Sequence, residues 1–526
     1  MHHRSLLAYA YAHSEDSAAA MADAVAGAVD YRGRPASRAA TGGWKSSVFV
    51  MAMEIAERFA YKGVAANLIT YLTGPLGQPM ARAAASIDAW KGVSQMLPLP
   101  VACVADAWLG RYRAIVLASI LFVVSMGTLS LSSAFHIFRS GGHVAVFYVA
   151  LYLVALGEGA HKPCAQAFAA DQFDEKDPKE NVARSSFFNW WYFGMCAGTA
   201  VTTMVSSYVQ DNVGWGLGFG IPCIVILVSL AVFLIGTPSY RYYTTKEPSP
   251  VARVGKALLV LIKSWRSKHR TNPASGKVEA KNSDEDLVEE TSTFFTKQAA
   301  TLDRRIGPKF KVPPAALQTF ISVSIVAFIP VYDRLFVPLA RRYTGRPTGI
   351  TMLQRVGAGL SLSLVAVVLS ALVEMRRLGV ARDAGLVDAP KAHLPMTLWW
   401  MVPQYVLIGV SDVFAMIGLQ EFFYDQVPDA VRSLGLALFL SIFGVGHLLS
   451  SFLISVIDRA TAKRGASWFS NNLNRAHLDY FYWLLAGLCV LELVAFFFFS
   501  RAYVYKKKSD DGDYRGGDAD ADATLV

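Results

Sequence analysis

Charged residues are scarce in this chain. Asp, Glu, Lys and Arg make up 17% of its 526 residues, whereas 53% of the residues are hydrophobic and the mean hydropathy is +0.34. A soluble domain carries about 25% charged residues, so the composition indicates a membrane protein. The net charge of +10 is then a signal of membrane topology, and we expect no binding to nucleic acid.

Cysteine is also rare, and its spacing gives no sign of a cross-linked or metal-bound framework. The chain has no CxxC or metal-ligand spacing, and all five cysteines lie in apolar segments: Cys103, Cys164, Cys196, Cys223 and Cys489. We interpret them as small core residues. No nucleophile–base pair, metal spacing or phosphate-binding glycine loop stands out, so we expect no enzyme activity, no cofactor and no metal.

Long uncharged runs specify the class of membrane protein. Residues 114–135, 212–236 and 433–457 contain no Asp, Glu, Lys or Arg, and each is long enough for the roughly 20 residues that cross a bilayer. They are too continuously apolar for barrel strands, which alternate. We therefore predict an all-α membrane protein with 11 spans, at about 47–73, 88–108, 113–136, 144–169, 186–209, 214–236, 314–337, 349–374, 396–424, 432–457 and 479–503.

Polar stretches divide the chain into five predicted parts. These are a cytoplasmic tail (1–43), a six-helix bundle (44–236), a cytoplasmic linker with an amphipathic helix and a remnant of the seventh helix (237–312), a second bundle with five visible spans (313–503) and a cytoplasmic tail (504–526). Within the linker, residues 251–265 have a short apolar core flanked by lysines, which predicts an amphipathic surface helix. No secretory signal peptide is expected, and both Met1 and Met21 remain candidate starts.

Two loops share a pattern that suggests an internal repeat. After the second span, Asp106 is followed by Gly110 and Arg111, and after the seventh candidate, Asp333 is followed by Gly345 and Arg346. Short arginine-rich loops stay cytoplasmic. The first loop resembles the DxxxGRxR signature of the major facilitator superfamily. The resemblance implies two six-helix bundles related by a repeat, with Asp106, Gly110 and Arg111 in a loop that takes part in conformational change.

Ionisable residues interrupt the first predicted span at regular intervals. Their spacing puts them on one face of a helix: Glu54, Glu57, Arg58, Tyr61 and Lys62. A central charge facing lipid costs roughly 2.5–3.5 kcal/mol, so this polar stripe should face the bundle interior or a watery cavity. Arg58 alone cannot neutralise two carboxylates, which makes one of them a proton acceptor. The alternative is a static salt-bridge network that only holds helices together.

Several stretches resemble one known family. The ExxERFxYxG pattern that begins at Glu54 resembles the first-helix motif of the proton-dependent oligopeptide transporter family. Residues 157–175 resemble its fourth-helix signature, and residues 187–194 and 419–428 resemble its plant branch, the nitrate and peptide transporter family. The resemblance implies a symporter that couples inward proton movement to uptake of nitrate, a short peptide, or a plant hormone or other carboxylate, in the plasma membrane or the vacuolar membrane.

The resemblance also implies roles for single residues. Glu54 and Glu57 match the proton-binding carboxylates, and Arg58 matches the coupling arginine. Lys162 matches the fourth-helix lysine, which in the family pairs with a tenth-helix glutamate. This chain has Asp412 at that position, one methylene shorter. The expected substrate contacts are Arg58, Tyr61, Lys62, Asn189 and Trp190.

Some of these assignments have open alternatives. Lys62 either adds positive potential that favours an anionic substrate, or simply pairs with a glutamate. Glu158 is either a further proton-relay member or a carboxyl that packs between helices. Trp190 is either a substrate contact or a core residue, and His161, which adjoins Lys162, either has a functional role or has none. His447, alone in an apolar helix, is expected to be a hydrogen-bonded core residue.

One span is missing from the predicted set. The spacing from Glu54 to Asp106, counted back from Asp333, leads to Lys281, within a polar stretch that has no apolar span. Both tails look cytoplasmic, which requires an even number of spans. We therefore expect that most of the seventh helix is absent. The main hypothesis is a symporter working by alternating access, with protons, a small anionic or peptide-like substrate and the lipid bilayer as partners. The alternative is a transport-incompetent isoform or a receptor-like membrane protein.

Overall fold

A computed structural model of the chain describes most of its residues. The described ranges are 24–104, 109–135, 142–174, 177–243, 284–307, 310–344, 350–390, 392–425, 432–462 and 467–503. Four predictions concern residues outside these ranges: the role of Asp106, the amphipathic helix at 251–265, the choice between Met1 and Met21, and the charged tail from residue 504.

Helices make up the first half of the chain. They are α2 (Gly43–Ala65), α3 (Leu68–Thr73), α4 (Met80–Met96), α5 (Pro98–Val104), α6 (Arg111–Phe135), α7 (Gly142–Ala170), α8 (Pro178–Asn212) and α9 (Trp215–Ile235). The first predicted span is thus divided between α2 and α3, and the second between α4 and α5. Pro98 accounts for the second break, because proline lacks the N–H that would continue the helix of α4.

The second half is also helical. Its elements are α11 (Asp284–Thr301), η3 (Pro314–Gln318), α12 (Thr319–Val331), the π-helical turn η4 (Tyr332–Phe336), α13 (Val337–Thr344), α14 (Met352–Asp383), η5 (Leu398–Met401), α15 (Val402–Asp425), α16 (Arg432–Ala462) and α17 (Leu478–Ala502). The helix α14 begins with a capping box, in which Thr351 and Gln354 satisfy each other's backbone N–H groups.

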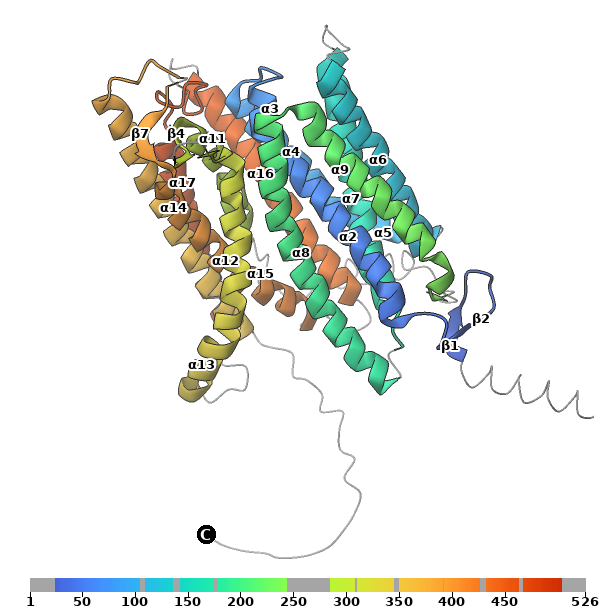
Figure 1. Ribbon diagram of the computed structural model, residues 1–526. Coiled ribbons are helices and arrows are strands. Elements are labelled where there is room, and N and C mark those ends of the chain that lie inside the picture. The colour runs from blue at the N-terminus through green and yellow to red at the C-terminus, as the bar shows by residue number, and fades with distance from the viewer. Residues whose placement is uncertain are drawn as a thin grey trace, which may run out of the picture.

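Helices of the two halves meet along two seams. The helix α4 packs on α16, and α8 packs on α12 (Figure 1). Two glycines allow the first seam to close: a Cβ added at Gly92 or at Gly444 would lie 2.9 Å from the backbone oxygen of the other. Ser450 of α16 also donates a hydrogen bond to Asp88 of α4 over 2.9 Å. The interior between the seams is where a site shared by both halves can lie.

Three small sheets accompany the helices. The N-terminal tail, for which the sequence predicted only a cytoplasmic position, contains β1 (Ala24–Val29), which pairs antiparallel with β2 (Pro35–Ser37) and with β3 (Tyr242–Tyr243). A short 3₁₀ turn, η2 (Thr237–Ser239), precedes β3. The tail is therefore attached to the chain just after α9. The other pairs are β4 (Leu302–Asp303) with β7 (Leu394–Thr397), and β5 (Arg305–Ile306) with β6 (Phe310–Lys311).

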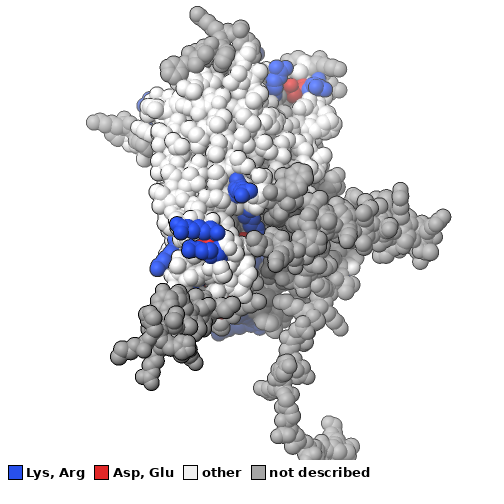
Figure 2. Space-filling model, turned by 90° about the vertical axis from the view of Figure 1, so that its right-hand side faces the viewer, with Lys and Arg blue, Asp and Glu red and all other residues white. Residues whose placement is uncertain are grey.

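The outer surface has the composition of a lipid-facing protein. Within the described residues, eight helices are long and apolar enough to cross a membrane. Leu117, Val124 and Leu131 on α6, and Ile224 and Leu227 on α9, are each more than half exposed. Figure 2 shows a broad uncharged area on this side of the molecule, with charged side chains gathered mainly toward its ends. The helices α2 and α8 are long enough to cross a membrane, but polar side chains interrupt their apolar runs. The helix α4, with 17 residues, is slightly too short to be counted with these eight.

The expectation that most of the seventh helix is absent is not confirmed. The helix α11 has 18 residues, about 27 Å at 1.5 Å per residue, and packs against α14, α16 and α17. Phe294 and Phe295 are fully buried, and Gln298 donates a hydrogen bond to Glu374 of α14 over 2.6 Å. Part of the predicted cytoplasmic linker is therefore inside the helical core.

Candidate functional site

The polar stripe of α2 is buried inside the first half. Glu54 is 1% exposed, Glu57 is fully buried and Tyr61 is 6% exposed. The helix α7 packs against α2 and presents a second polar face, one residue of which is Glu158, 3% exposed. Carboxylates held in such an interior need counter-charges or protons, because burial penalises the charged form.

One arginine lies between carboxylates of both helices. The Nε of Arg58 is 3.7 Å from Oε2 of Glu57, and its Nη1 donates a 3.4 Å hydrogen bond to Oε1 of Glu158. The same oxygen of Glu158 lies 3.9 Å from Nζ of Lys162. Glu158, for which a packing role was left open, thus accepts a hydrogen bond from Arg58 and lies at ion-pair distance from Lys162. The sequence signal that could have found it is its i, i+4 spacing to Lys162.

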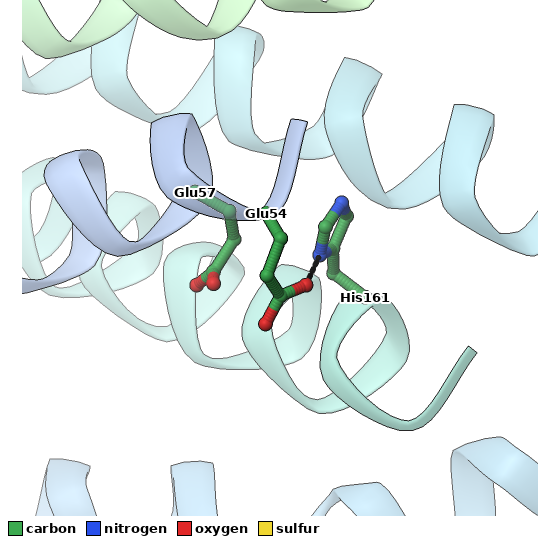
Figure 3. Close-up of side chains that lie close together, drawn as sticks. All are labelled: Glu54, Glu57 and His161. Carbon is green, nitrogen blue, oxygen red and sulfur yellow. Dashed lines mark ion pairs between the residues drawn. The ribbon is translucent and has the colours of Figure 1, made fainter. Parts of the chain in front are cut away.

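A second pair lies on the other side of the stripe. Figure 3 shows Glu54 and His161 turned toward each other, with Nδ1 of His161 3.4 Å from Oε2 of Glu54. Ligand atoms of Glu54, Glu57 and His161 all lie within 4.8 Å of one another. The two carboxylates and the imidazole make no hydrogen bond within the described structure. The cluster therefore has the chemistry to hold a proton or a small cation.

A cavity of about 350 Å³ opens beside these pairs, lined by both halves of the chain. Arg58 and Lys62 line it from α2 and Lys162 from α7, while Ile325 of α12 and Asp412 of α15 line it from the second half. Its volume is at the lower end of the range for small-molecule sites. A site between two helical bundles is where a transporter that alternates its access holds its cargo.

The charge of the cavity lining is strongly positive. Its described lining residues include the four cations Arg58, Lys62, Lys91 and Lys162, against the single carboxylate of Asp412. Lys91, on α4, was not singled out from the sequence. The signal was available, since it is a lysine inside a predicted membrane span, and intramembrane charges are functional candidates by default.

Three other expected substrate contacts, Tyr61, Trp190 and Asn189, are not among the described residues that line this cavity. Tyr61 stacks on Trp90, with ring centroids 5.1 Å apart, and is buried behind the lining. Trp190 is 59% exposed and is not among the lining residues, whereas Met195 and Thr199, further along α8, are. The side chain of Asn189 lies outside the described part of α8. His447 is fully buried on α16.

The predicted conformational loop contacts the end of α7. Gly110 has φ of 74°, a backbone conformation that glycine adopts without strain. The residue after it, Arg111, donates a 2.5 Å hydrogen bond from Nη1 to Asp171. This contact ties the start of α6 to the start of the α7–α8 connection, at the end of the molecule that carries β1 and β2 (Figure 1).

A buried arginine joins the two ends of the first half. Arg241, 1% exposed, donates to the backbone oxygen of Thr41 over 2.8 Å and to Oε2 of Glu180 over 2.6 Å. Glu180 lies in the first turn of α8, before the predicted span. Partial burial raises the pKa of Glu180, but the hydrogen bonds from Arg241 and from the backbone N–H of Asp174 outweigh it and leave that pKa below its usual value.

Comparisons with known proteins identify the family. A sequence model described as "PTR2: POT family" matches residues 112–289 and 286–469. Protein NRT1/ PTR FAMILY 5.10 of Arabidopsis thaliana is 51% identical over 535 residues, covering 91% of this chain and 96% of that protein. Protein NRT1/ PTR FAMILY 5.16 of the same plant is 46% identical, covering 94% of this chain and 99% of that protein. The first alignment is longer than the 526 residues of this chain, so it includes positions that this chain lacks.

Solved structures of transporters share the fold. The POT family transporter PepTSo superposes with a TM-score of 0.68 at 19% identity, covering 87% of this chain and 98% of that one. An auto-inhibited POT family peptide transporter also has a TM-score of 0.68 at 19% identity, covering 90% of this chain and 99% of that one. The predicted all-α membrane protein with the major facilitator fold is thereby confirmed, and the chain belongs to the POT family of membrane transporters.

Proposed function

We propose that this protein is a proton-coupled symporter of a small anion, working by alternating access. One observation carries the proposal: a cavity lined by both halves has four cationic side chains and one carboxylate among its described lining residues, and it adjoins the buried pairs of Arg58. Nitrate and carboxylates, including plant hormones, have the required charge. A short peptide fits less well because its amino terminus would face mostly cations.

Coupling follows from the position of Arg58. Its guanidinium lies within 3.7 Å of Glu57 and 3.4 Å of Glu158 and also lines the cavity. When a carboxylate of the stripe takes up a proton, it holds the arginine less strongly. Arg58 is then available to an anionic substrate. Because proton and substrate each change the charge balance of the same guanidinium, each favours binding of the other.

Alternating access requires contacts that differ between two states. Lys162 of the first half and Asp412 of the second line the same cavity. We assign them to a latch that closes one entrance when the Lys162 ammonium moves from Glu158, 3.9 Å away, toward Asp412. Such a movement would transmit the protonation state of the stripe to the interface between the halves.

Transport in liposomes made from the purified protein tests the proposal. With an acid exterior, labelled nitrate or a labelled carboxylate hormone should accumulate, and a protonophore should collapse the accumulation. Accumulation of a neutral dipeptide alone would overturn the anion assignment. Binding without uptake would instead favour the transport-incompetent alternative.

A matched pair of variants tests the cationic lining. Lys91→Gln removes a positive charge from the cavity, whereas Arg382→Gln removes one from the exposed end of α14. We expect the first to raise the KM for the anion at least about tenfold, the cost of one charge-assisted hydrogen bond, and the second to leave it unchanged. Equal effects would show that only the overall charge matters.

A further inference from the structure

The coupling scheme above uses the contacts of Arg58 with Glu57 and Glu158. It names no contact of Glu54, the other carboxylate expected to bind protons, and it gives His161 no role. Glu54 lies on α2 and His161 on α7, and both are at most 1% exposed. Their closest atoms, Oε2 and Nδ1, are 3.4 Å apart (Figure 3). Neither side chain makes a hydrogen bond within the described structure. Buried polar groups are normally satisfied, so this pair requires an explanation.

Charge balance indicates what the pair needs. The cluster holds three carboxylates, Glu54, Glu57 and Glu158, and two basic side chains, Arg58 and Lys162. With all three carboxylates ionised and a neutral imidazole, one buried negative charge has no counterpart. A single proton on His161 neutralises the cluster and turns the 3.4 Å contact into an ion pair. A divalent cation would overshoot the balance by one charge.

Among the described residues, the ion pairs of this cluster are formed by side chains of α2 and of α7 itself. The helix α5 contains no charged residue, and α6 contains none after Arg113. On α4, Asp88 accepts a hydrogen bond from Ser450 of α16, and Lys91 lines the cavity. The described groups that face the imidazole are therefore those of α2 and of α7 itself.

We propose that His161 and Glu54 form a second proton-binding site, and that protonation of His161 sets the pH at which uptake begins. This inference rests on the proposed symport. Imidazole is the side chain whose charge changes between pH 5 and 8, the range in which a cell's membranes maintain proton gradients. When His161 is neutral, Glu54 is left as a buried carboxylate that competes with Glu57 and Glu158 for Arg58. When His161 is charged, Glu54 is paired and Arg58 is more readily released.

The pH profile of uptake tests this site against a matched control. His161→Gln keeps a polar side chain but removes the titratable group. Only the other ionisable groups of the cluster then remain to titrate, so the pH of half-maximal uptake should move away from the wild-type value. His447→Gln makes the same change at a fully buried position on α16 and should leave the midpoint in place. An unchanged midpoint in His161→Gln would overturn the proposal.

A stability measurement keeps this test separate from that of symport. We compare the unfolding temperatures of the wild type and of His161→Gln. The difference between them should become smaller from pH 5 to pH 8, because deprotonation of His161 removes the ion pair with Glu54. Glu54→Gln should abolish the same pH dependence. Proton-independent uptake together with this stability profile would reject symport and support the proton site. A difference that does not vary with pH, or that appears only when Zn²⁺ is added, would overturn the proton site.

Discussion

Replacing Glu158 by glutamine removes the carboxylate that both coupling cations share. The side chain is 4% exposed, with Arg58 at 3.4 Å and Lys162 at 3.9 Å. Glutamine keeps the size and one acceptor oxygen but not the charge. We expect the variant to lose proton-driven uptake, because Arg58 is then held by Glu57 alone and Lys162 has lost its partner on its own helix.

The expected cost in stability follows from the geometry. A 3.4 Å contact between unit charges is worth about 5 kcal/mol at an effective dielectric constant of about 20. Part of this is offset, since forming the pair desolvates both groups. Removing one partner of a buried pair typically costs about 3–5 kcal/mol. For a chain of this length that corresponds to a fall in unfolding temperature of about 3–5 °C.

A second buried ion pair provides the control. Glu374 and Arg377 of α14 are at most 1% exposed and 2.7 Å apart, and neither lines the cavity. Glu374→Gln should lower the unfolding temperature by a similar amount while leaving the pH profile of uptake intact. Thermal unfolding in detergent and uptake into liposomes measure the two effects. Wild-type uptake with a wild-type pH profile in Glu158→Gln would refute the shared-carboxylate scheme.

Three further predictions concern the cavity and the loop. Lys162→Ala and Asp412→Ala should each slow uptake, with non-additive effects of about 0.5–3 kcal/mol in a double-mutant cycle; strictly additive losses would argue against contact. Lys62→Tyr should weaken binding of an anionic substrate more than that of a neutral one, as measured by competition. Arg111→Gln should slow transport without weakening substrate binding, because Arg111 contacts Asp171 at 2.5 Å, outside the cavity; an unchanged rate would exclude a conformational role.

The sequence predicted best those features for which the alternative placement has a high free-energy cost. Charges in an otherwise apolar helix must avoid lipid, so the interior position of Glu54 and Glu57 followed from spacing alone. Long uncharged runs gave most of the helices. The breaks after α2 and α4 were less predictable, because the apolar pattern continues across them and only local signals such as Pro98 mark the change.

The partners of these charges were harder to predict. Glu158 and His161 lie on α7, about 100 residues from the α2 charges they contact, and which face of α7 meets α2 depends on how the bundle is assembled. A lone acidic or basic residue in an apolar helix indicates a site but not its partner. The N-terminal strands were missed for a related reason: β1 pairs with β3, more than 200 residues away.

The helix α11, which lies where the seventh span was expected, has one part that the sequence could predict and one part that it could not. From Thr293 onward, α11 has an apolar face that buries Phe294 and Phe295 in the core, and Gln298 bonds to Glu374 and Tyr482. Its first seven residues, DEDLVEE, contain five acids, a composition that a bilayer disfavours strongly. The two matches to the POT family meet at residues 286–289, inside this acidic stretch. The change of composition and the break in similarity therefore coincide. A helix forms here despite the missing hydropathy signal because the part of α11 from Thr293 onward is packed into the core. The acidic first residues continue the axis that this buried part fixes.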